Sequence, residues 1–140
     1  MEKSNSTLAQ QIAQAAIAFE RQRTGNHLPT SVTVVIGGGT LVITLHGALT
    51  PAEKALARNP EGAAKIQEFH RQLFASASGS LRQEIQRITG MEVREATTEL
   101  EPAAGAVVHA FTSGEVVQVF LLNGHMPTET WSGSEAEILS

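Results

Sequence analysis

The stretch Gly47-Ala48-Leu49-Thr50-Pro51-Ala52-Glu53-Lys54 decides how the chain divides into elements. The Thr50 hydroxyl can accept a hydrogen bond from the amide three residues on, and the Glu53 carboxylate can accept one from the Thr50 amide; together they form a capping box. Pro51 falls at the first helical position, where its missing amide proton costs nothing. The stretch therefore predicts a helix that begins directly after Thr50.

A second helix start, Asn59-Pro60-Glu61, introduces the longest periodic segment of the chain. Apolar residues recur there in steps of three and four, at Ile66, Phe69, Leu73, Ala77, Leu81, Ile85 and Ile88. This spacing predicts a central helix over residues 60–89, about 45 Å long, with Gly90 as its C-terminal cap. The Ser76-Ala77-Ser78-Gly79-Ser80 segment is the place where such a helix would kink.

The segments before the capping box predict one helix and two strands. Leu8, Ile12 and Phe19 recur at helical spacing, and Gly25 is suited to end that first helix. Residues 32–36 and 40–46 are rich in β-branched residues and flank three glycines, Gly37-Gly38-Gly39. Because glycine reaches positive φ without steric cost, this pattern predicts a β-hairpin.

Three strand candidates follow the central helix, at residues 92–100, 106–112 and 116–122. The expected fold class is α+β: an N-terminal helix, a β-hairpin, a long central helix and a two- to three-stranded antiparallel meander in one mixed sheet. A single domain is expected over residues 1–122. Residues 123–140 are polar and lack periodicity, and they are expected to form a flexible or partner-docked tail.

Composition excludes several functional classes. The 140 residues include no cysteine, which removes disulfides, thiolate nucleophiles and cysteine-ligated metals. The net charge of −4 and the 4% aromatic content argue against nucleic-acid binding. No apolar run approaches the roughly 20 residues that cross a bilayer, and the N-terminus lacks the pattern of a signal peptide. A cytoplasmic protein without direct membrane insertion is expected.

No motif predicts catalysis, and we expect that the protein is not an enzyme. The triple glycine is followed by strand formers rather than by the helix that a phosphate-binding loop requires. None of the five histidines lies within five positions of another, so no metal or cofactor is expected, although convergence of His46, His70 and His109 stays open. His46, at a strand end, and His109, within a strand, are the candidate ligand-binding residues.

Several strands are apolar on both faces, as the neighbouring pairs Val34-Val35, Leu41-Val42 and Val119-Phe120 show. An antiparallel sheet with one solvated face should alternate, so either a second helical layer or a second protomer must cover the extra apolar side chains. Tryptophan is enriched at interfaces, and the single tryptophan lies in the polar tail. The predicted interface residues are Val35, Val42, Val119, Phe120 and Trp131.

The middle of the chain resembles a bacterial family of unknown function, the C component of a sodium-translocating, membrane-potential-generating system (MpsC). The resemblance covers residues 8–93 and rests above all on Gly47-Ala48-Leu49-Thr50-Pro51-Ala52-Glu53-Lys54. Other matching stretches are Thr24-Gly25-Asn26, Pro29-Thr30-Ser31-Val32, Leu41-Val42-Ile43, Arg71-Gln72-Leu73-Phe74 and Ile88-Thr89-Gly90. The resemblance implies a small cytosolic accessory protein associated with ion or inorganic-carbon transport, and it brings no catalytic residues.

Two functional hypotheses follow. The leading one is a non-enzymatic, homo-oligomeric accessory protein, a homodimer or higher oligomer, that contacts a membrane-associated transport or regulatory protein. The alternative is a small-molecule or metal-binding sensor domain in which His46 and His109 lie near a pocket.

Overall fold

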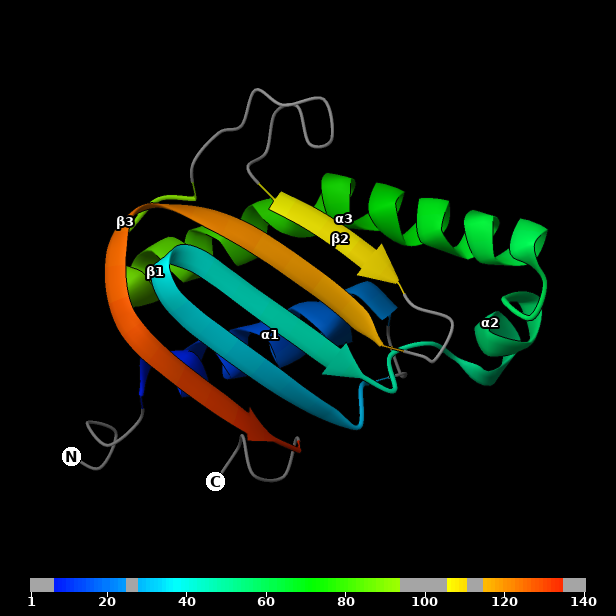
Figure 1. Cartoon of the computed structure of the whole chain (residues 1–140), viewed down its shortest axis with the longest axis horizontal. Coiled ribbons are helices and arrows are strands. Elements are labelled where there is room, and N and C mark those ends of the chain that lie inside the picture. Colours follow the sequence, from blue (N-terminus) through cyan, green and yellow to red (C-terminus); the bar gives the residue numbers. More distant parts are fainter. Residues whose placement is uncertain (1–6, 25–27, 94–105, 111–114, 135–140) are drawn as a thin grey trace.

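The computed structural model describes residues 7–24, 28–93, 106–110 and 115–134. Its elements are α1 (Leu8–Thr24), β1 (Ser31–His46), α2 (Pro51–Leu56), α3 (Pro60–Thr89), β2 (Ala106–Ala110) and β3 (Val116–Gly133), arranged as Figure 1 shows. The predicted α+β class is confirmed. The three strands form one antiparallel sheet in the order β1-β3-β2.

Helix α2 begins, and helix α3 begins and ends, where the capping signals predict, whereas Gly25, the predicted end of α1, lies outside the described residues. Thr50 Oγ1 accepts a hydrogen bond from the Glu53 amide at 3.1 Å, and Glu53 Oε1 accepts one from the Thr50 amide at 2.8 Å. Asn59 Oδ1 accepts from the Gly62 amide at 2.7 Å and caps α3, and Gly90 ends α3 with a φ of 78°. The helix α3 is continuous over its 30 residues, and the serine-rich segment where the sequence predicts a kink does not interrupt it.

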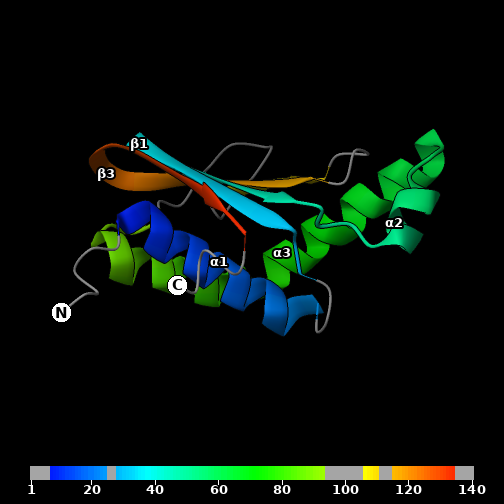
Figure 2. The ribbon, with the colours of Figure 1, turned by 90° about the horizontal axis from the view of Figure 1, so that it is seen from below.

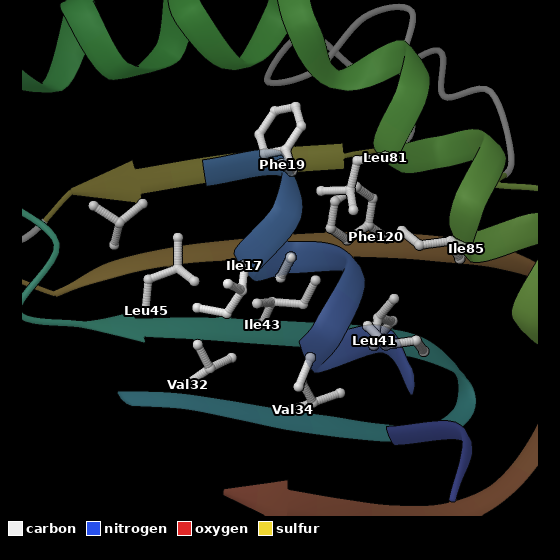
Figure 3. Packing of buried hydrophobic residues seen from close by; sticks show 14 of the residues in the cluster. Ile17, Phe19, Val32, Val34, Leu41, Ile43, Leu45, Leu81, Ile85 and Phe120 are labelled. Atoms are coloured by element: carbon white, nitrogen blue, oxygen red, sulfur yellow. The ribbon is translucent and has the colours of Figure 1, made fainter. Parts of the chain in front are cut away.

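The predicted hairpin corresponds to β1, a single 16-residue strand element that doubles back at its three glycines. Gly38 takes a φ of 56°, a conformation that glycine adopts at little cost. The two halves of β1 lie side by side in Figures 1 and 3. The Thr30 amide donates to the His46 carbonyl at 2.7 Å, which joins the start of the first half to the end of the second.

The long strand β3 wraps around both halves of β1. Residues 116–121 pair with residues 40–45, and residues 129–133 pair with residues 32–36, with irregular register in between. Part of the predicted meander is present, since β2 pairs with the first half of β3. Of the predicted strand over residues 92–100, Val93 forms an isolated bridge with Leu122, and residues 94–100 lie outside the described residues.

The expected tail needs a correction, because residues 123–133 belong to β3. This half of β3 lies at the margin of the sheet, where only part of each side chain is covered, so the residues are mostly polar and show no apolar alternation. Residues 135–140 lie outside the described part of the chain.

The helices α1 and α3 cover one face of the sheet, and the core lies between the two layers (Figure 2). Alternate residues are buried in this core along residues 32–36 and 41–45 of β1 and residues 116–122 of β3. Phe120 is fully buried there, with its ring 5.7 Å from that of Phe74 on α3. Figure 3 shows strand residues Val32, Val34, Leu41, Ile43, Leu45 and Phe120 against Ile17, Phe19, Leu81 and Ile85 of the helices.

Candidate functional site: the open face of the sheet

The face of the sheet that points away from α1 and α3 is not covered by any described element (Figure 2). We call this surface the open face. Because side chains alternate along a strand, it is formed by the residues between the buried ones. They are Thr33, Val35, Thr40, Val42, Thr44, His46, Val117, Val119, Leu121, Thr128, Thr130 and Ser132.

The centre of the open face is apolar. Val42 lies directly opposite Val119, and the neighbouring cross-strand pairs place Val117 and Leu121 beside threonines of β1. Val35 is 40% exposed, one of the three exposed large hydrophobic residues in the described part of the chain. The valines that the sequence showed next to buried neighbours therefore gather on one surface.

The margin of the open face is polar and nearly uncharged. Thr33 Oγ1 lies 2.6 Å from Ser132 Oγ and 3.0 Å from His46 Nε2. His46 Nδ1 lies 3.8 Å from Glu115 Oε2, and both side chains are 35% exposed. Among the open-face residues of β1 and β3 only His46 is ionisable, and Glu115 borders it. An apolar centre within a polar rim is the anatomy of a protein interface.

The predicted interface residues divide between the two faces. Val35, Val42 and Val119 lie on the open face, as the leading hypothesis requires. Phe120 is fully buried beneath the helices and cannot contact a partner, which corrects its assignment. Trp131 also lies on the helix side, opposite Val34, where it is half-buried and packs against the core. The sequence showed that both faces are apolar, but not which member of each pair the helices cover.

The two candidate ligand-binding histidines belong to the two strands that flank β3 in the sheet. His46 ends β1 and contacts Glu115 and Thr33, whereas His109 of β2 stands opposite Val117 in the strand register. His70 lies elsewhere, buried between α2 and α3, so it does not converge with His46. Within the described residues, no three His, Cys, Asp or Glu side chains form a group that could hold a metal ion.

One buried polar contact was missed by sequence reasoning, the pair Glu53–His70. Glu53 Oε2 lies 2.9 Å from His70 Nε2, and His70 is 4% exposed. Burial raises the pKa of Glu53, but hydrogen bonds from Thr50 and His70, together with the His70 charge, outweigh this effect and lower the pKa overall. The capping glutamate therefore also fastens α2 to α3. The two residues are 17 positions apart in the sequence, so no local sequence pattern predicts their contact.

Comparison with known proteins places the chain in a family. Residues 4–115 match the family described as "Na+-translocating membrane potential-generating system (MpsC)". The chain belongs to the MpsC family. It is also 29% identical over 111 residues to the "Uncharacterized protein YbcI" of Bacillus subtilis (strain 168). The aligned region covers 79% of this chain and 89% of that protein. No solved structure matches the chain.

The family match confirms the resemblance seen in the sequence and extends it beyond residue 93. It stops directly before β3, so the part of the open face that β3 contributes lies outside the matched residues of this MpsC-family protein. No helix in the described part of the chain has both the length and the apolar character needed to cross a membrane.

Proposed function

We propose that this protein is a non-enzymatic accessory protein of a membrane-potential-generating system, and that it self-associates through the open face. The observation that carries the proposal is a sheet face that no described element covers. Its apolar centre is formed by Val35, Val42, Val117, Val119 and Leu121. Exposed apolar patches rimmed by polar residues mark interaction sites in soluble proteins. The link to a membrane system is supported by the description of the family.

A second copy of the chain fits the open face by charge. In a two-fold dimer the same surface meets itself, so any concentrated charge of one sign would be repelled. The open-face residues of β1 and β3 avoid this problem, because their only ionisable side chain is His46, which lies 3.8 Å from the Glu115 carboxylate at the margin of the face. Two threonine- and valine-rich faces can therefore stack without burying an unpaired charge.

The size of the face agrees with a reversible dimer. The sheet has five strand segments side by side: the two halves of β1, the two halves of β3, and β2. With neighbouring strands about 4.8 Å apart the face is about 24 Å wide, and with about 3.3 Å per residue it is about 20 Å long. Stacking two such faces would bury on the order of 1,000 Å², near the lower limit of specific interfaces. We therefore expect association that depends on concentration.

Sedimentation equilibrium of the wild type and of Val119→Glu tests the proposal. We expect the wild type to dimerise and the variant to dimerise at least about tenfold more weakly, because 1.4 kcal/mol of buried charge is enough for that factor. Ala64→Glu, on the exposed surface of α3, is the matched control and should associate like the wild type. Equal association of Val119→Glu and the wild type, with both folded by circular dichroism, would contradict the proposal.

The alternative of a sensor domain that uses His46 and His109 stays a prediction with less support. His46 already contacts Thr33 and Glu115, and it lies at the margin of the open face. A ligand at 100 times its dissociation constant would add about 2.7 kcal/mol of stability. Thermal-shift measurements with divalent metals, nucleotides and bicarbonate therefore separate the two hypotheses.

A further inference from the structure

The second half of β3 forms one edge of the sheet. Residues 129–133 pair with the first half of β1, and no described residue pairs with their other side. In Figure 1 this half of β3 is the outermost segment of the sheet. An unpaired strand edge offers a row of free amide and carbonyl groups to another strand.

The edge has few of the features that natural proteins use to block such pairing. Residues 128–133 contain no lysine or arginine, and Pro127 stands only at their beginning. The single charge, Glu129, points to the helix side, where its carboxylate accepts the Ala9 amide of α1 at 2.6 Å. That contact supplies Glu129 with a partner at a helix N-terminus, where a negative charge is favoured.

The edge sequence can pair with itself without placing like charges opposite each other. In an antiparallel pair of strands, two residues that lie opposite each other point to the same face of the sheet. A two-fold axis perpendicular to the sheet meets this condition only if it passes through a residue and not between two residues. An axis at Glu129 would place two glutamates opposite each other, which is destabilising. An axis at Thr130 places Thr128 opposite the partner's Ser132 and Glu129 opposite the partner's Trp131, and the whole pairing stays within β3.

We propose that the β3 edge pairs antiparallel with the same edge of a second copy, with the two-fold axis at Thr130. This contact extends the sheet sideways, whereas the open face is buried by stacking, so one molecule can make both contacts. Threonine and tryptophan favour strands, and threonine pairs across strands are stabilising. The partner is a second copy, because the register above opposes no like charges and aligns residues 127–133 of both strands, whereas an axis at Trp131 would align only residues 129–133 within β3.

Single-cysteine variants test this pairing cleanly, because the chain has no cysteine of its own. Directly opposed strand residues lie within the Cα separation that a disulfide spans. We expect Thr130→Cys to form a disulfide-linked dimer under mild oxidation several-fold faster than Ala64→Cys, an exposed position on α3 that reports random collision. An equimolar mixture of Thr128→Cys and Ser132→Cys should give the mixed dimer in excess over either homodimer.

Further variants separate this proposal from the open-face dimer. Val35→Cys lies one strand inside the edge, opposite Thr130, and edge pairing should not cross-link it. Thr130→Cys cross-linking should persist when Val119→Glu is added, since the two contacts are independent. The proposal is overturned if Thr130→Cys cross-links no faster than Ala64→Cys, as expected if other residues of the same chain cover the edge. It is also overturned if Thr130→Cys cross-links only with Ser132→Cys, which would place the axis at Trp131.

Discussion

At the scale of single residues, Glu53 has two structural roles: it caps α2 and it joins α2 to α3 through His70. One carboxylate oxygen accepts the Thr50 amide and the other lies against buried His70. We expect Glu53→Ala to lower the free energy of unfolding by about 1–2 kcal/mol, since it removes a cap and leaves His70 unpaired. Urea denaturation measures this loss. Glu61→Ala, an exposed position in the first turn of α3, should change stability far less.

The lowered pKa of Glu53 also predicts a dependence on pH. A carboxyl group whose pKa is lower in the folded state binds a proton more readily in the unfolded state. The ionised carboxylate therefore stabilises the folded protein at pH values above the unfolded-state pKa. That stabilisation is lost as the pH falls through the folded pKa. The stability difference between the wild type and Glu53→Gln should therefore shrink from neutral pH to about pH 3. A difference that stays constant over this range would show that the Glu53 charge does not contribute.

At the scale of elements, two glycines of α3 differ in what surrounds them. A Cβ at Gly62 would lie 1.9 Å from the carbonyl oxygen of Leu56, where the backbone turns from α2 into α3, whereas a Cβ at Gly79 meets no atom within 4 Å. We expect Gly62→Ala to destabilise the protein by more than about 1 kcal/mol. Gly79→Ala should stabilise it by about 0.5–1 kcal/mol, because alanine favours helix. Thermal denaturation should give melting shifts of opposite sign; shifts of the same sign would contradict this account.

Neighbouring residues of β3 should also respond differently. Phe120 is buried against Phe74, so Phe120→Ala should cost about 3–5 kcal/mol of folding stability. Val119 lies on the open face, and Val119→Ala should cost less than about 1 kcal/mol when measured at a concentration where the protein is monomeric. If both substitutions cost the same, the assignment of the two faces would be wrong.

Helix boundaries were predictable from the sequence because their signals are local. The caps at Thr50, Asn59 and Gly90 depend on residues within one turn, and the structure confirms all three. The path of β3 depends on contacts across nearly the whole chain, such as that of Val32 with Gly133. Edge residues there carry no apolar period, so the sequence resembled a tail. For the same reason, Glu53 was recognisable as a cap but not as the partner of His70.

At the scale of the whole molecule, the described helices cover only one side of the sheet. Helices α1 and α3 bury Phe120 and its neighbours, and no described element lies on the valines of the opposite face (Figure 2). The sequence showed that the strands were too apolar for one helical layer. The structure adds that the surplus apolar residues gather on one continuous surface, and that this surface is nearly uncharged.

The molar mass of the unmodified protein tests the central claim most directly. The chain has a mass of 14.9 kDa. Sedimentation equilibrium over a series of protein concentrations should show the average mass rising from this value to at least twice this value at high micromolar concentration. A mass that stays at that of one chain over the whole series would contradict self-association through the open face.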